Sequence, residues 1–224
     1  MKLGILFSGG KDSCYALKLA MDKEEVVCLI SIISTNKESY MFHTPNVHLV
    51  KLQAEAIGLP LIEVKTAGEK EEELKDLRKA IMFAKKKYKI EGIVTGAIES
   101  VYQASRIQKI CNDLSLQCIN PLWKKNQEQL LYELLENKFE IIISGVFAYP
   151  FDESWLGKII DKKTISELVA FSNKYKINPA GEGGEIETTV LHAPFFKKKI
   201  KVIDSFKEYN NYAGIYVIKK AIIE

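Results

Sequence analysis

A run of six residues near the start of the chain has the chemistry to hold phosphate groups. It reads Ser8-Gly9-Gly10-Lys11-Asp12-Ser13. The run joins an apolar stretch to a helical pattern. Glycines at such a junction let backbone N–H groups turn inward, where the positive end of the helix dipole also points. The serine hydroxyls can donate to phosphate oxygens, Lys11 can neutralise their charge, and Asp12 can hold a Mg²⁺ ion that bridges them. The sequence therefore predicts a phosphate-binding loop with Asp12 as its metal ligand.

This loop is not the P-loop of kinases and GTPases, which requires Gly-x-x-x-x-Gly-Lys followed by Ser or Thr. Ile5 occupies the position of the first glycine, and Asp12 follows the lysine. The pattern Ser-Gly-Gly-x-Asp-Ser instead resembles the N-type ATP pyrophosphatases. That resemblance implies that ATP and Mg²⁺ are the cofactors, that ATP is cleaved between its α- and β-phosphates, and that AMP passes to a substrate oxygen.

Three further positions belong to the expected nucleotide site. In doubly wound sheets ligands bind at the carboxyl ends of the strands, so we expect Ser34 and Gly96, at the ends of the second and fourth predicted strands, to lie there. His43 either hydrogen-bonds a phosphate or the incoming group, or has a structural role. We expect no zinc site, because His43 and His48 have no cysteine or carboxylate cluster beside them at metal-ligand spacing.

A polar helical face follows the fourth predicted strand. Its members are Glu99, Ser100, Tyr102, Gln103 and Arg106. Residues 99, 102, 103 and 106 are separated by three or four positions, so they share one side of a helix. Arg106 is one of only two arginines, and a guanidinium group binds carboxylate or phosphate with two parallel hydrogen bonds, which lysine cannot do. We expect Arg106 to bind such a group, with a surface ion pair as the alternative.

A third polar stretch places two glycines between carboxylates. It reads Gly181-Glu182-Gly183-Gly184-Glu185-Ile186-Glu187-Thr188. The glycines allow a backbone turn close to a ligand, and Glu185 and Glu187 share one face if the chain is extended. Carboxylates here can hold a second metal, guide ammonium or bind a cationic substrate group. A glycine turn with solvated glutamates is the alternative that needs no function.

The last two stretches, together with a segment after the second predicted strand, resemble the diphthine–ammonia ligase family. That segment reads Tyr40-Met41-Phe42-His43-Thr44-Pro45-Asn46. Residues 122–123 and 152–157 fit the same family, so the match covers essentially the whole chain. The resemblance implies that ATP activates the carboxylate of diphthine on translation elongation factor 2 as an acyl-adenylate. Pyrophosphate then leaves, and ammonia displaces AMP to form the amide.

The resemblance also implies a set of site residues and partners. Catalytic roles are implied for Lys11, Asp12, Arg106, Glu185 and Glu187. The substrate is expected to contact Glu99, Ser100, Tyr102, Gln103, Arg106, Glu182, Gly183, Gly184 and Glu185. The implied partners are elongation factor 2 bearing diphthine and free ammonium, and a homodimer is possible. Two other readings remain open, an ATP-binding regulatory module and a tRNA-modifying N-type ATP pyrophosphatase.

The elements that must position these residues alternate between strand and helix, which is typical of crossover units in a parallel sheet. Strands are predicted at 2–7, 26–34, 61–64, 92–95 and 140–145, and helices at 11–22, 46–57, 70–88, 101–114 and 127–137. Beyond about residue 150 we expect a helix at 163–175 and strands at 188–191, 200–206 and 212–223. The predicted fold is α/β, with a doubly wound, mostly parallel sheet of the HUP type over residues 1–148. A smaller C-terminal α+β region covers residues 149–224.

Composition narrows the setting. The 224 residues carry 32 basic and 29 acidic side chains, and a net charge of +3 is too small to indicate a nucleic-acid partner. The four cysteines form no Cys-x-x-Cys pair and no secretory leader is apparent, so we expect a cytoplasmic protein. No uncharged apolar run approaches the roughly 20 residues that span a bilayer, which excludes a membrane protein.

Overall fold

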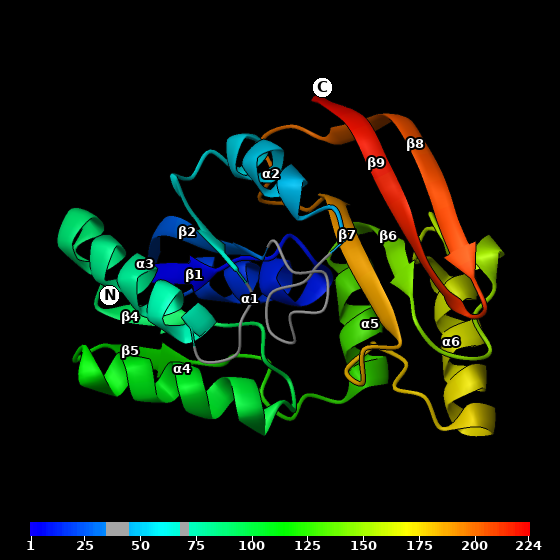
Figure 1. Ribbon diagram of the computed structural model, residues 1–224, viewed down its shortest axis with the longest axis horizontal. Helices are drawn as coiled ribbons and strands as arrows, with labels where there is room; N and C mark the ends of the chain where they lie inside the picture. The colour runs from blue at the N-terminus through cyan, green and yellow to red at the C-terminus, as the bar shows by residue number, and fades with distance from the viewer. Residues whose placement is uncertain (35–44, 68–71) are drawn as a thin grey trace.

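The computed structural model describes residues 1–34, 45–67 and 72–224, and its N-terminal half is built on a five-stranded parallel sheet (Figure 1). The strands are β1 (Lys2–Leu6), β2 (Glu25–Ser34), β3 (Leu61–Thr66), β4 (Gly92–Val94) and β5 (Gln117–Ile119). Their order is β3-β2-β1-β4-β5, and each neighbouring pair is parallel. The connecting helices are α1 (Lys11–Met21), α2 (Val50–Ile57), α3 (Glu72–Tyr88) and α4 (Val101–Asp113). The predicted doubly wound α/β sheet is therefore confirmed.

Helices cover both faces of this sheet because its strands are apolar on both sides. Side chains of β1 such as Leu3 and Ile5 pack with α1 and α2, whereas Cys28 and Ile30 of β2 pack with α3 and α4. Alternate residues of a strand point to opposite faces, so each strand contributes to two separate cores. The loop that follows β1 thus begins at the end of a strand that lies in the middle of the sheet, between β2 and β4.

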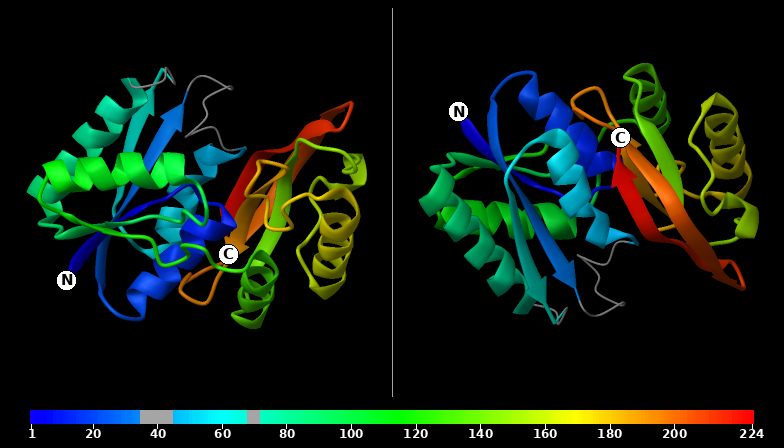
Figure 2. Two further views of the ribbon diagram at one scale, coloured as in Figure 1. Left: turned by 90° about the horizontal axis from the view of Figure 1, so that it is seen from below. Right: turned by 90° about the horizontal axis from the view of Figure 1, so that it is seen from above.

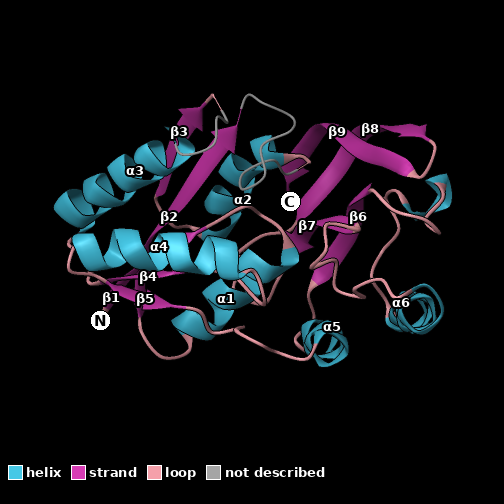
Figure 3. Cartoon of the chain, turned by 60° about the horizontal axis from the view of Figure 1, so that its bottom comes forward, coloured by secondary structure: helices cyan, strands magenta, loops and turns pink. Residues whose placement is uncertain are grey.

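A second sheet of four antiparallel strands forms the C-terminal part of the chain. Its order is β7-β6-β9-β8, with β6 (Glu140–Val146), β7 (Ile186–His192), β8 (Ile200–Asn210) and β9 (Ala213–Ile223). Two helices accompany it, α5 (Gln127–Glu136) and α6 (Lys162–Tyr175). Figure 2 shows α6 on the side of this sheet away from the five-stranded sheet, and Figure 3 shows α5 and α6 end-on with roughly parallel axes. The expected smaller α+β region is present.

The prediction for residues 140–145 was wrong in one respect. We expected this strand in the parallel sheet, but β6 pairs antiparallel with β7 and β9. Its apolar run is buried on both sides, as in a central strand of either sheet type, so hydrophobicity alone does not identify the partners. The short strand β5 and the 3-10 helix Glu153–Trp155 were not predicted, and the helix predicted at 46–57 begins as a 3-10 helix, Val47–Leu49.

The two sheets share a hydrophobic core. The cluster around α1 and α2 continues through Leu130 of α5, Ile143 of β6 and Val190 of β7. Within the part of the chain that the structure describes, no helix is long and apolar enough to cross a membrane.

A side-chain clamp attaches the segment before α2 to the second sheet. Asn46 donates its amide to the carbonyl of Tyr216 at 2.8 Å and accepts the N–H of Ile218 at 2.9 Å. His48 Nε2 lies 3.0 Å from the carbonyl oxygen of Ile218. These contacts satisfy backbone groups of β9 as a neighbouring strand would, and they hold the two halves of the chain together.

Candidate active site

The Ser8–Ser13 loop, which is the predicted phosphate-binding loop, joins β1 to α1 and is shaped in part by its own hydroxyls. The Ser13 hydroxyl donates to the carbonyl of Gly10 at 3.1 Å and accepts the N–H of Ser8 at 3.3 Å, while the two serine hydroxyl oxygens are 3.2 Å apart. Gly9 has φ +80°, and a Cβ atom there would lie 2.1 Å from Gln53 Oε1. Only glycine fits this position.

Lys11 and Asp12 form a tight ion pair at the start of α1. The ammonium of Lys11, a residue only 3% exposed, lies 2.8 Å from Asp12 Oδ2. The other oxygen, Asp12 Oδ1, is buried and accepts no hydrogen bond from any described residue. An unsatisfied buried carboxylate oxygen costs roughly 1–3 kcal/mol or more, and a cation bound there removes that cost. Asp12 Oδ1 therefore has an acceptor position that no described residue fills.

No ready-made metal cage surrounds Asp12, because the described residues contain no group of three or more His, Cys, Asp or Glu side chains suited to a metal ion. Mg²⁺ commonly binds through one or two carboxylates together with substrate phosphates rather than in a cage of protein ligands. The residues present thus fit Mg²⁺ that arrives with a nucleotide.

Gly96 lies against this loop, at the point where the chain leaves β4. A Cβ atom on Gly96 would lie 2.8 Å from the backbone carbon of Asp12 and 2.8 Å from the nitrogen of Ser13. Such contacts are too short for any side chain, so glycine lets the β4 turn pass directly over the first turn of α1. Ser34, the last residue of β2, lies at the carboxyl edge of the same sheet. His43 lies outside the described residues.

Two carboxyl groups from the Gly181–Thr188 stretch interact with the loop. Burial raises the pKa of Glu182 to about 7, and the negative charge of Asp12 adds to the rise. Burial likewise raises the pKa of Glu187 to about 7, with Lys11 opposing the shift and Asp12 supporting it. Glu182 Oε2 also accepts the N–H of Glu99 at 3.3 Å. The loop, the turn after β4 and the start of β7 therefore meet in one charged cluster.

Glu185 differs from these two carboxylates because its own loop engages it. Its Oε1 accepts the backbone N–H and the side-chain amide of Asn178 at 2.8 and 2.9 Å, and its Oε2 accepts the N–H of Gly183 at 2.9 Å. Glu185 also lies before β7 begins, outside the extended segment that carries Glu187. Gly184 adopts φ +82°, which suits the turn. The structure thus uses Glu185 to brace the loop that presents Glu182.

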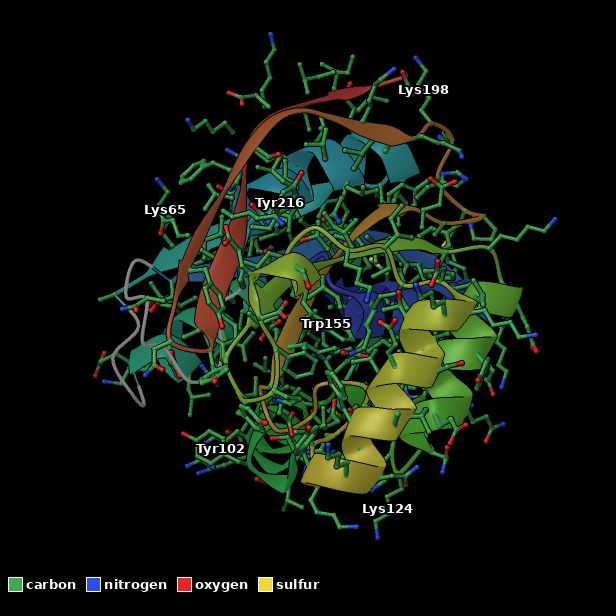
Figure 4. All side chains as sticks on the ribbon, turned by 90° about the vertical axis from the view of Figure 1, so that its right-hand side faces the viewer. Lys65, Tyr102, Lys124, Trp155, Lys198 and Tyr216 are labelled. Atoms are coloured by element: carbon green, nitrogen blue, oxygen red, sulfur yellow. The ribbon has the colours of Figure 1, made fainter. Side chains whose placement is uncertain are left out.

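The predicted polar helical face is only partly formed, because α4 begins at Val101 and Glu99 therefore lies in the turn before it. The residues of this face that belong to α4, namely Tyr102, Gln103 and Arg106, are half-buried. Ser100 is the N-cap of α4, and its hydroxyl accepts the N–H of Gln103 at 3.4 Å. Four residues apart, Tyr102 and Arg106 stack, with the guanidinium carbon 3.5 Å from the centre of the phenol ring. Figure 4 shows Tyr102 at the edge of the molecule, whereas Trp155 lies inside, beside α6. Stacking leaves the edge of a guanidinium plane able to donate hydrogen bonds.

Two further residues at the loop were not identified from the sequence. Gln53 is 1% exposed, and its amide donates to the carbonyls of Gly9 at 2.9 Å and Val190 at 2.8 Å. The hydroxyl of Thr188 accepts the N–H of Lys11 at 3.1 Å. Gln53 did carry a signal, as a polar residue on the buried side of α2. A threonine in a strand is too common to provide one.

Comparison with known proteins agrees with this arrangement. The diphthamide synthase N-terminal domain model matches residues 1–118, and the diphthamide synthase C-terminal domain model matches residues 126–223. A diphthine–ammonia ligase from Bos taurus is 36% identical over 96% of this chain and 88% of its own length. Those from Rattus norvegicus and Homo sapiens are 37% and 36% identical, over 90% and 92% of this chain and 83% and 84% of their own lengths.

One solved structure covers 87% of this chain and 98% of its own, at 17% identity and a TM-score of 0.42: a predicted subunit of tRNA methyltransferase from Methanocaldococcus jannaschii. The fold is defined by the strand order β3-β2-β1-β4-β5 of the parallel sheet. The two domain matches, which together span nearly the whole chain, and the identity to relatives over most of their length show that this chain belongs to the diphthamide synthase family.

Proposed function

We propose that this protein is a diphthine–ammonia ligase that amidates diphthine on translation elongation factor 2. The reaction uses ATP and ammonia and releases AMP and pyrophosphate. The observation that carries the proposal is the meeting of the Ser8–Ser13 loop with Glu182 and Glu187, in a chain that matches the family along its length. A phosphate-binding loop alone accounts for ATP use, and the carboxylates beside it supply an acceptor side.

On the nucleotide side, the residues of the loop bind and orient the triphosphate. Lys11 and the start of α1 offset the charge of the pyrophosphate that leaves. Asp12 Oδ1 is the atom that would hold Mg²⁺, which supplies positive charge to the phosphate oxygens. Ser34 and Gly96 are proposed to border the nucleotide, since both lie at the carboxyl edge of the parallel sheet.

On the acceptor side, the diphthine carboxylate attacks the α-phosphorus and becomes an acyl-adenylate, because a carboxylate is a poor electrophile until one oxygen is a good leaving group. Ammonium binds between Glu182 and Glu187, and Glu187 accepts the proton that ammonium loses before ammonia attacks the acyl carbon. A carboxylate with a pKa near 7 is a better base than an ordinary glutamate at neutral pH. AMP then leaves.

Arg106 and Glu185 have supporting roles in this proposal. The guanidinium of Arg106, stacked on Tyr102, binds a carboxylate or phosphate oxygen of the reactants. We propose that Glu185 positions its own loop and does not act catalytically, because its two oxygens accept hydrogen bonds from Asn178 and Gly183. Cys14, Cys28, Cys111 and Cys118 are all free thiols, which supports the reduced, cytoplasmic setting that we propose.

The decisive experiment combines purified protein with ATP, Mg²⁺, ammonium and elongation factor 2 that bears diphthine. We expect AMP and pyrophosphate to appear in step with the amide, which mass spectrometry of the modified peptide detects. Omission of ammonium or use of unmodified factor should stop amide formation. Release of ADP, or turnover that is indifferent to the factor, would contradict the proposal. ATP binding without turnover would favour a regulatory module instead.

A further inference from the structure

The first turn of α1 is capped by a residue from the other sheet. The N-cap position of α1 is Gly10, which has no side chain to accept the exposed N–H groups of the helix start. The Lys11 N–H instead donates to the hydroxyl of Thr188, at 3.1 Å. Thr188 belongs to β7 and is only 4% exposed, so this hydrogen bond crosses from one sheet to the other inside the protein.

Backbone contacts bring β7 against the loop at the same place. The N–H of Val190 donates to the carbonyl of Gly9 at 3.0 Å, and a Cβ atom on Gly10 would lie 3.3 Å from the carbonyl oxygen of Thr188. Gln53 joins the same two segments through its amide. Figure 1 shows β7 beside the start of α1, and the two elements are in contact. β7 therefore lies so close to the loop that the Thr188 hydroxyl can help to fix the position of one relative to the other.

The residues on either side of this hydrogen bond carry the proposed chemistry. Its donor is the backbone of Lys11, which precedes Asp12, and its acceptor follows Glu187 directly in β7. We infer that Thr188 is a positioning residue that aligns the phosphate-binding loop with the acceptor-side carboxylate. This inference rests on the ligase function proposed above. Alignment of two reacting partners affects the rate of their reaction more than the binding of one of them.

The test compares three variants that differ in one buried hydroxyl. Thr188→Val keeps the shape of the side chain and removes the hydroxyl, whereas Thr188→Ser keeps the hydroxyl. Thr189→Val is the matched control, because Thr189 is the next residue of β7, is 3% exposed and points to the opposite face of the strand. The full chain is used throughout, with AMP formation measured in the presence of diphthine-bearing elongation factor 2.

For Thr188→Val we expect kcat for AMP formation to fall about tenfold, as loss of one buried hydrogen bond predicts, while the Kd for ATP changes by less than about twofold. Thr188→Ser and Thr189→Val should retain kcat near that of the unmodified protein. The inference is overturned if Thr188→Val and Thr189→Val have the same kcat. It is also overturned if ATP binding weakens as much as kcat falls, because Thr188 then supports the loop alone.

A second measurement needs no variant and does not depend on turnover. Hydrogen exchange of the Lys11 amide in the full chain should be at least about 100-fold slower than for an exposed amide, because the donor is bonded inside the protein. Exchange as fast as in an exposed segment would overturn the inference. If the unmodified protein forms no AMP with elongation factor 2, the proposed ligase function fails, while this exchange result still reports whether the Thr188 hydrogen bond exists.

Discussion

The phosphate-binding loop and the acidic loop before β7 reach the same place in opposite ways. Residues 8–13 make contacts among themselves, such as those of the Ser8 and Ser13 hydroxyls and of the neighbouring Lys11–Asp12 pair, in addition to the hydrogen bonds that Gln53 and Thr188 form with the loop. Glu182 and Glu187 instead owe their raised pKa values first to burial in the assembled fold and then to the charges of Lys11 and Asp12, and Glu182 also accepts the N–H of Glu99. A local sequence pattern identifies the first kind of site, and only the assembled fold produces the second.

The largest expected effect is that of Asp12→Ala, which tests whether the loop carries the metal. We expect AMP formation to fall by about 10³-fold or more, because Asp12 Oδ1 is the oxygen proposed to hold the ion and alanine removes it. Thermal unfolding should remain cooperative. Asp22→Ala is the control at the other end of the same helix, since Asp22 is exposed and forms an ion pair with Lys18, and it should leave the rate unchanged. A near-normal rate in Asp12→Ala contradicts the metal role.

Glu187→Gln tests the acceptor side. We expect kcat for amide formation to fall about 100-fold, the usual worth of a general base, with little change in ATP binding. In the unmodified protein the rate should rise as pH increases through about 7, because the base is active when deprotonated. That rise should be smaller in Glu187→Gln. An unchanged pH profile would remove Glu187 from the proposed proton transfer, and Glu208→Gln, at an exposed site, serves as the control.

Arg106→Lys asks whether the stacked guanidinium does what a simple positive charge cannot. We expect about a tenfold fall in kcat/KM for the modified factor, because lysine keeps the charge but loses the planar pair of donors. Arg78→Lys is the matched substitution, at an exposed position of α3. Equal rates for the two variants would indicate that Arg106 is an ion-pairing surface residue.

The smallest effect concerns stability. In the folded protein the pKa of Glu187 is raised to about 7, above its ordinary value of 4.5. Between pH 4.5 and pH 7 the Glu187 carboxyl group is therefore protonated in the folded state and ionised in the unfolded state. The contribution of this bound proton to the free energy of unfolding is complete below pH 4.5 and is lost as the pH rises through 7. Because glutamine does not titrate, the free energy of unfolding of Glu187→Gln, measured in urea relative to the protein without the substitution, should increase by about 1–2 kcal/mol when the pH is raised from 5 to 8. No gain would indicate that the carboxyl group is well solvated.

The sequence predicted the elements of the parallel sheet well because their hydrophobic periods are long and their helices are bounded by clear signals, such as Gly58 after α2. It predicted the loop because its glycines and hydroxyls act within six residues. It misassigned β6, since an apolar strand buried on both faces reads alike in a parallel and an antiparallel sheet. It also grouped Glu185 with Glu187. Only the fold shows that Glu185 accepts two hydrogen bonds from Asn178.

Sequence by itself determined that the Ser8–Ser13 loop lies at a strand-to-helix junction, and its motifs identified the family along the whole chain. Tertiary structure decided which carboxylates belong to the loop and what holds it in place. The reason is physical. Backbone curvature and hydroxyl contacts act between neighbours in the chain, whereas burial, Coulomb interaction and the hydrogen bonds of Gln53 and Thr188 depend on strands that meet only after folding.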